Sequence, residues 1–460
     1  MCLVRGCPTN PGVSYYGPSN LYAYLLNSAS SSSSAKPFIE PEEEKEGVRP
    51  HNELFETVTA SYRPSSDTST ANLPPQSLVR EILEYYQQSV EVFFPVIGSE
   101  LSSQLSALLS TGSETLQDDS SVEFAILRLL LAISFQLMAR YNPSLSSIAL
   151  AYFLNISEAR LREALSRPNV TTLQLLTLIS IYLMLDRRGG NVWTALDQAL
   201  CLSETLELKC ERNGLLGQIR NTLFVLEVDV CVALGRPTNH AERMEGPQEE
   251  SFSTKLHELA KIRLTIHHQL LNTRHHNSDD IAAWSEPVHE ALEQWIHSWE
   301  SLTGPPPGYS ATGFEDCSKS ANLLYGRYNC LQATFELFTL LRARSGTVID
   351  QDASTSASLI ESFNKLYESG RDSPSIPRGH EKSMIPPPTP FIGWTQEETI
   401  FKAITCLSFR KHHEVPDTEL RLTLTRLLHD HNHAKLFMGE MFQSLNNDTP
   451  RFSPTDTEDG

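Results

Sequence analysis

The chain has 460 residues, of which 40% are hydrophobic, so it can bury a sizeable core and is not disordered throughout. Its 56 acidic residues outnumber its 37 basic residues and give a formal net charge of −19. Because a surface this acidic repels phosphate backbones, and no cluster of lysine and arginine offers a local exception, the chain by itself is a poor nucleic-acid binder.

Residues 1–75 have the composition of a loosely ordered N-terminal segment. They contain a serine run from Ser30 to Ser34, an acidic run around Glu43 and a Pro/Ser/Thr-rich stretch that ends at Pro74 and Pro75. Such a composition buries too little apolar surface to offset the entropy of the chain. The polar, acidic tail at 446–460 is also expected to be disordered. The folded domain is therefore predicted at residues 76–445.

A helical pattern begins at Gln76 and stops at Pro95, which cannot supply the next backbone donor. Its apolar face repeats at three- and four-residue steps and consists of Leu78, Val79, Ile82, Leu83, Tyr86, Val90 and Phe93. The stretch from Val122 to Ala139 is apolar nearly all round, which predicts a helix at the centre of the domain. Polar and charged residues interrupt it too often for a membrane span.

Two capping signals predict the next helices. Asn155 with Glu158 three residues later is typical of a helix start, and this helix is expected to run to about residue 166. Thr171 with Gln174 fits the same pattern and opens an apolar run that ends at Leu185.

Two further helices follow a turn predicted at 186–190. Asn191 is placed to cap the first, whose apolar stripe is Val192, Ala195, Leu196, Ala199 and Leu206. The second runs from about Leu215 to Leu234, with Ile219, Leu223, Leu226 and Val230 facing inward. Gly235 then suits the left-handed position that closes a helix, and Pro237 lies just beyond it.

The C-terminal half is also helical but more interrupted. The predicted helices are Ser253 to Leu271, Glu286 to Trp299, Ser320 to Arg344, Ala357 to Glu368, Thr395 to Phe409 and Asp417 to Ser444. Proline-rich breaks lie at 304–308 and 373–390. No alternating strand pattern and no internal repeat is visible. The fold class predicted is all-α, a large multi-helix bundle between a disordered N-terminal segment and a short disordered tail.

The sequence lacks the motifs of the common enzyme classes. It has no glycine-rich phosphate loop, no GxSxG elbow and no HExxH. Asp279 and Asp280 lack the third carboxylate that an all-α enzyme binding a metal diphosphate would need. We therefore predict that the chain is not an enzyme and has no catalytic residue and no bound cofactor.

Two groups of residues have weak metal-binding character. His429 and His433 share a helix face and could hold one ion, but no further ligand is visible, and an exposed polar stretch is the favoured interpretation. Cys2 and Cys7 are two thiols where a structural zinc site needs four ligands. We predict no metal site, and we expect the cysteines to be reduced and mostly buried.

Three tryptophans surround one amphipathic stretch. Trp284, Trp295 and Trp299 could line a ligand pocket between helices. Ordinary core packing is favoured, because aromatic stripes at helical spacing are usually core.

Four motifs follow one another in a fixed order. They are Tyr15-Tyr16-Gly17-Pro18-Ser19, then Phe93-Phe94-Pro95-Val96, then Thr172-Leu173-Gln174-Leu175-Leu176 with Trp193, and finally Leu234-Gly235-Arg236-Pro237. Their order and spacing over about 220 residues resemble the regulatory, or middle-homology, region of fungal zinc-cluster transcription factors, best over residues 76–300. The residues that carry the resemblance are Tyr16, Gly17, Ser19, Phe94, Pro95, Gln174, Trp193, Gly235, Arg236 and Pro237.

The resemblance implies a nuclear regulator of RNA polymerase II transcription whose helical domain responds to effectors or protein contacts. The implied partners are a second copy of the chain or related transcription factors, with a small-molecule effector possible in principle and no membrane. DNA and zinc binding are implied only through a six-cysteine module with an adjacent basic helix, which these 460 residues do not contain.

Two explanations fit the missing module. The sequence is either truncated, or it is a relative that regulates transcription as a dimerising or effector-sensing cofactor without touching DNA. The segment at 14–25 favours truncation, because in the family it directly follows the zinc-cluster linker. The sequence names neither the target genes nor the effector.

Overall fold

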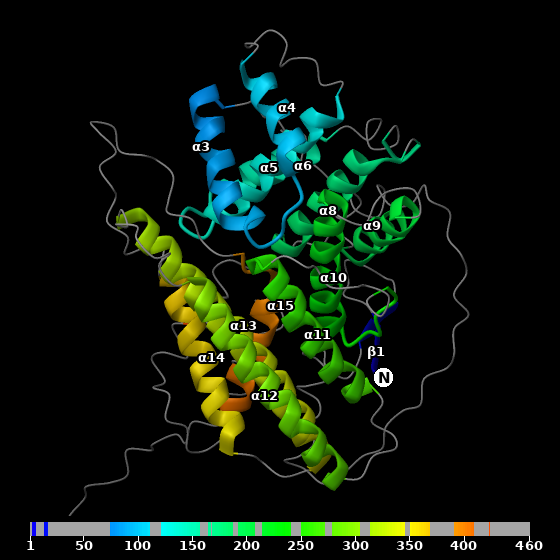
Figure 1. The fold of residues 1–460 in the computed structure, drawn as a ribbon, viewed down its shortest axis with the longest axis vertical. Helices are drawn as coiled ribbons and strands as arrows, with labels where there is room; N and C mark the ends of the chain where they lie inside the picture. Colours follow the sequence, from blue (N-terminus) through cyan, green and yellow to red (C-terminus); the bar gives the residue numbers. More distant parts are fainter. Residues whose placement is uncertain are drawn as a thin grey trace, which may run out of the picture. The chain divides into compact units, whose positions relative to one another are not determined.

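The computed structural model describes residues 2–5, 13–16, 74–110, 121–156, 164–166, 168–186, 192–207, 214–240, 250–271, 278–303, 313–345, 350–368, 391–408 and 423. The chain divides into two units, Met1–Val415 and Pro416–Gly460, and every helix whose bounds the structure defines lies in the first. Most described residues of this first unit are helical (Figure 1), which confirms the predicted all-α class.

A short hairpin is the exception. Strands β1 (Cys2–Arg5) and β2 (Val13–Tyr16) pair antiparallel, with Cys2 opposite Tyr16 and Arg5 opposite Val13. No strand was expected here from the sequence. Four-residue strands are too short to show the alternation on which such a prediction depends.

The first helices confirm the predicted starts and add elements. Helix α3 (Gln76–Tyr86) continues into a π-helical turn, η1 (Gln87–Glu91), and α5 (Val122–Met138) is buried on nearly every side. Helices α4 (Gly98–Ser110) and α6 (Leu145–Leu154) were not predicted.

Two capping predictions were wrong in detail. Helix α8 (Val170–Leu185) is capped by Asn169, whose Oδ1 accepts a hydrogen bond from the backbone N–H of Thr172 at 2.9 Å, and not by Thr171. Asn155, predicted to begin a helix, closes α6, while residues 157–163 of the helix predicted after it lie outside the described residues. A polar residue beside an apolar run marks a boundary, but it does not say which of two neighbouring polar residues has the extended backbone that a cap needs.

Helices α9 (Val192–Glu207) and α10 (Leu215–Leu234) follow, and the residues predicted to face inward are all buried. Gly235 closes α10 with φ of 66°, in the left-handed region as predicted. Of the turn predicted at 186–190, residues 187–190 lie outside the described residues, as does Asn191, its predicted neighbour and helix cap.

The helices of the C-terminal half are α11 (Phe252–Leu271), α12 (Ser278–Thr303), α13 (Gly313–Ser345), α14 (Asp350–Glu368) and α15 (Trp394–Ser408). Four of these helices are longer than predicted, and the fifth, α15, has the predicted length shifted by one residue. Helix α12 continues on both sides of Pro287, where the sequence predicted a start. The helix predicted from Asp417 to Ser444 falls outside the described residues.

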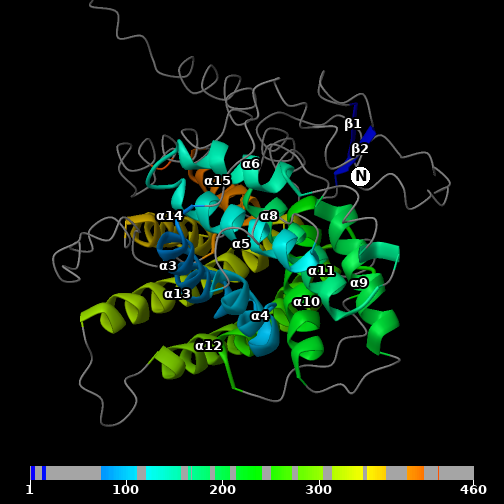
Figure 2. The same cartoon turned by 90° about the horizontal axis from the view of Figure 1, so that it is seen from above.

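Helices far apart in the chain pack together at the centre. Helix α10 contacts α8, α9, α11 and α15, and α13 contacts α11, α12, α14 and α15 (Figures 1 and 2). The last described helix, α15, therefore packs against helices from the first half of the domain. Within the part of the chain that the structure describes, no helix has the length and apolar character required to cross a membrane.

The tryptophans belong to this core. Trp299 is fully buried, stacks on Phe93 with ring centroids 6.2 Å apart and contacts the rings of Phe252 and Tyr325. Trp295 is also buried, and its Nε1 donates to the carbonyl of Lys255 at 2.6 Å. Core packing, the favoured interpretation, is therefore what the structure shows for Trp295 and Trp299.

Candidate functional site

The Phe-Pro motif is held by side chains from two helices. The Nε2 atom of Gln174, on α8, donates to the carbonyls of Val96 and Ile97 at 2.8 Å each. The hydroxyl of Thr222, on α10, donates to the carbonyl of Pro95 at 3.4 Å. The prediction that Gln174 helps to cap a helix was therefore wrong, because its amide joins its own motif to the Phe-Pro motif.

Glu91 holds the same segment from its other side. Its Oε1 accepts the backbone N–H groups of Val96 at 3.0 Å and Ile97 at 2.8 Å. Burial raises the pKa of Glu91 to about 7, and the backbone donors partly oppose that rise. Side chains thus satisfy both the donors and the acceptors of Val96 and Ile97, in a segment that makes neither helix nor strand.

Arg236 of the Gly-Arg-Pro motif contacts Trp193, the tryptophan that belongs to the third motif. With Gly235 left-handed, the backbone N–H of Arg236 turns back to the carbonyl of Cys231 at 2.9 Å. The guanidinium of Arg236 lies over the ring of Trp193 on α9, 5.5 Å from its centroid. Of the remaining motif residues, Tyr16 ends β2, while Gly17 and Ser19 lie outside the described residues.

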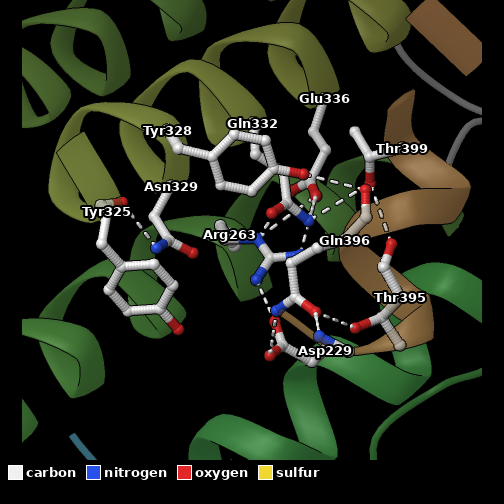
Figure 3. A network of polar contacts seen from close by, with 11 residues as sticks. Asp229, Arg263, Tyr325, Tyr328, Asn329, Gln332, Glu336, Thr395, Gln396 and Thr399 are labelled. Atoms are coloured by element: carbon white, nitrogen blue, oxygen red, sulfur yellow. Dashed lines mark hydrogen bonds and ion pairs between the residues drawn. The ribbon is translucent and has the colours of Figure 1, made fainter. Parts of the chain in front are cut away.

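Beside this region lies a buried ionic network centred on Arg263 of α11 (Figure 3). Its Nη1 donates to Asp229 of α10, and its Nη2 donates to Glu336 of α13 at 2.8 Å. Nε also donates to Glu336, at 3.0 Å. Only 4% of the Arg263 side chain is exposed, so the guanidinium has exchanged water for two carboxylates.

The two acids keep the guanidinium charged. Burial alone would lower the pKa of Arg263, but Glu336 and Asp229 raise it above its ordinary value. Burial raises the pKa of Asp229, against the opposing effect of Arg263. One cation on α11 therefore binds carboxylates from α10 and α13 and joins the three helices.

Amides and hydroxyls extend the network to α15. Gln396 donates to Asp229 at 3.3 Å, and its backbone carbonyl accepts from the hydroxyl of Tyr328 at 2.8 Å. Gln332 donates to Glu336 at 3.3 Å and to Thr399 at 3.2 Å. Sequence reasoning missed this network. The sequence feature that could have indicated it is a charged residue inside an apolar helix, such as Asp229 between two valines.

A cavity of about 30 Å³ adjoins the network, between α10, α11, α13 and α15. Its lining includes Gln332, His267 and Lys402 as well as the three ionic residues. Lys402 is paired with Glu398 at 3.2 Å. Since one water needs roughly 10–15 Å³, the cavity has room for about two waters or a group of that size.

Two buried atoms of the cavity lining are unpaired acceptors. The Nε2 atom of His267 donates to the carbonyl of Arg236 at 2.7 Å, and burial lowers the pKa of His267 to about 4. The ring is therefore neutral at pH 7, which leaves Nδ1 with a lone pair. Within the described residues, neither this Nδ1 nor the Oε1 of Gln332 has a hydrogen-bond partner. Both acceptors belong to residues that line the cavity and are suited to a small group that donates hydrogen bonds.

The other predicted candidates are not joined to this region. Cys2 lies in β1, whereas Cys7, His429 and His433 fall outside the described residues. Among the cysteines whose side chains the structure describes, Cys201, Cys231, Cys330 and Cys406 form no disulfide. Cys231 and Cys406 are buried as expected, but Cys201 is exposed and corrects that expectation.

In comparisons with known proteins, no family model, no curated protein and no solved structure matches the chain.

Proposed function

We propose that residues 76–445 contain the regulatory domain of a nuclear regulator of RNA polymerase II transcription, of the fungal zinc-cluster type. In this proposal the domain is not an enzyme and does not itself contact DNA. In the family, DNA and zinc are bound by a six-cysteine module with an adjacent basic helix, which this sequence does not include. The domain acts through protein contacts, as a homodimer or with related factors, or through an effector.

The supporting observation is the set of bonds between the residues of the resemblance. Gln174 of one motif donates to the carbonyls that follow Pro95 of another, and Arg236 of a third lies over Trp193. Generic helix patterns would place such residues without regard to one another. Here Gln174 and Arg236 make two contacts between motifs that are distant in the sequence. This is what is expected if the motifs belong to one domain of the resembled kind.

The net charge of −19 supports the part of the proposal in which this domain does not itself contact DNA. A gel-shift titration of the full chain at physiological salt is expected to show no sequence-selective DNA binding. Tight binding to one sequence would contradict the proposal.

Tethering tests the regulatory role itself. We expect the full chain, fused to an unrelated DNA-binding domain, to raise or lower transcription of a reporter carrying that domain's site. Gln174→Leu should abolish the effect by releasing the Phe-Pro segment, and Gln104→Leu, at an exposed position on α4, should not. A nuclear fusion that leaves the reporter unchanged in both activating and repressing contexts would overturn the proposal.

The cavity favours a second candidate function, an effector-sensing cofactor without DNA contact. A small amine or amide could donate to Gln332 and His267 and change the packing of α15 against α10. Melting of the full chain with methylammonium, formamide and urea at low concentration tests this. A shift that Gln332→Leu removes is expected, and an unchanged melting temperature with all three probes would exclude these donors as ligands.

A further inference from the structure

A cluster of metal-binding side chains lies away from the ionic network, where α9 meets the segment after α10. Asp197 and Cys201 are four residues apart and so share one face of α9. His240 follows the Gly-Arg-Pro turn and reaches the same face. One ligand atom from each residue lies within 4.8 Å of the others, so the side chains already converge on one point.

The orientation of the imidazole is fixed from outside the cluster. Nδ1 of His240 lies 2.9 Å from Oε1 of Glu204, one turn further along α9. Since a carboxylate only accepts, Nδ1 carries the proton and the lone pair of a neutral ring lies on Nε2. A carboxylate that orients a histidine through its second nitrogen is the usual outer-shell partner of a metal-binding histidine.

Two of the facing atoms are spaced as neighbouring ligands of one ion. Nε2 of His240 lies 3.4 Å from Oδ1 of Asp197, longer than a typical hydrogen bond. Without a metal, a protonated imidazole forms an ion pair with Asp197 across this distance. A divalent cation can take the place of that proton between the two atoms. Bonds of about 2.0–2.3 Å in a tetrahedral zinc site place neighbouring ligand atoms about 3.3–3.6 Å apart.

A buried carboxyl group positions His240 and adds to the local excess of acids. The Oε1 atom of Glu227 accepts the backbone N–H groups of Asn239 at 2.8 Å and His240 at 3.0 Å. Glu227 has no exposed surface, and within the described residues its Oε2 has no hydrogen-bond partner. Two carboxyl groups thus contact the ring nitrogens of His240 and a third contacts its backbone, an excess of acids that favours a divalent cation.

We propose that Asp197, Cys201 and His240 bind a zinc ion, with Glu204 orienting the histidine and water as the fourth ligand. The mixed sulfur, nitrogen and oxygen donors suit zinc and not magnesium or calcium, which prefer oxygen alone. Binding replaces the thiol proton of Cys201, which is released to solvent. The ion would fasten the segment after Gly235 to α9, beside the contact of Arg236 with Trp193. This zinc is distinct from any in a DNA-reading module.

The test is metal binding by the full chain after its metal has been removed with a chelator. Calorimetric titration with zinc should give one ion per chain, and cobalt(II) in its place should give the absorption of a sulfur–cobalt bond. Cys201→Ala and His240→Ala should each weaken zinc binding at least about 100-fold, and Glu204→Gln about 10–100-fold, with the cobalt–sulfur band kept only in the last.

Matched controls separate the site from the other cysteines and histidines. Cys330→Ala, on α13, and His289→Ala, at an exposed position on α12, should bind zinc as the unaltered chain does. Circular dichroism of each variant shows whether it is folded, and Asp197→Asn supplies a further ligand variant. The proposal would be overturned if the unaltered chain binds no zinc, or if Cys201→Ala and His240→Ala bind zinc as tightly as the unaltered chain.

Discussion

Gly326 of α13 lies directly against the indole of Trp299 on α12: a Cβ at position 326 would fall 2.1 Å from the indole Nε1. The close approach lets the backbone of α13 sit on the ring while Nε1 donates to the carbonyl of Asn322 at 3.0 Å. Trp299 in turn stacks on Phe93, which adjoins the Phe-Pro motif. Because glycine has no side chain, Gly326 allows α13 to approach Trp299 closely. This approach fixes the position of the ring and, through Phe93, its contact with the Phe-Pro motif.

Replacing Gly326 by alanine should destabilise the domain. Alanine favours a helix by about 1 kcal/mol over glycine, but the overlap with a buried ring costs about 1–3 kcal/mol and forces Trp299 to move. Urea unfolding of Gly326→Ala should show a lower midpoint and altered tryptophan fluorescence. Ser320→Ala, at an exposed position on the same helix, should be neutral or slightly stabilising. A Gly326→Ala domain as stable as the original would contradict the close approach.

Removing the amide of Gln174 should loosen the Phe-Pro segment. Gln174→Leu keeps the volume but leaves the carbonyls of Val96 and Ile97 without these donors, at a cost of about 1–3 kcal/mol for each buried group. Thermal unfolding and amide hydrogen exchange at 96 and 97 measure the effect. Gln104→Leu, exposed on α4, should change neither quantity. Unchanged exchange in Gln174→Leu would show that the amide is dispensable.

Glu91 predicts a pH dependence of stability. Its pKa is about 7 in the folded state against 4.5 as the ordinary value, so the folded state holds the proton more tightly. Stability is therefore lost as pH rises from about 4.5 through 7, by up to roughly 3 kcal/mol at 1.36 kcal/mol per pKa unit. Glu91→Gln keeps the Oε1 acceptor and removes the charge, so its advantage should grow from pH 5 to pH 8.

Unfolding free energies of the two proteins at several pH values measure this difference. Glu100→Gln, at an exposed position on α4, is the control and should follow the unaltered protein. A constant difference between Glu91→Gln and the unaltered protein across this range would mean that Glu91 titrates normally.

The ionic network predicts non-additive variants. Arg263→Met leaves Asp229 and Glu336 buried without their cation and should cost about 3–5 kcal/mol. Adding Asp229→Asn and Glu336→Gln removes the stranded charges, so the triple variant should recover much of that loss. Arg327→Met, which breaks the exposed pair with Glu300, should cost no more than about 1 kcal/mol. Chemical denaturation checks all three, and a triple variant weaker than Arg263→Met would refute the reasoning.

The sequence by itself determined the fold class and most of the helices. Apolar residues at helical spacing are a local signal, so the inward faces of α3, α9 and α10 could be predicted directly. Gly235 was equally local, because a left-handed backbone after a helix favours glycine whatever surrounds it.

Only the tertiary structure decided which polar residues meet. Gln396 bonds to Asp229 across 167 positions of the chain, and Gln174 reaches Val96 across 78. Judged from its neighbours in the chain alone, the amide of Gln174 resembles part of a helix cap. Hydrogen bonds and ion pairs act over a few ångströms, so their partners are fixed only after apolar faces have packed and brought distant helices together. That is why the helices could be predicted one at a time, while the Arg263 network and the meeting of His240 with Cys201 could not.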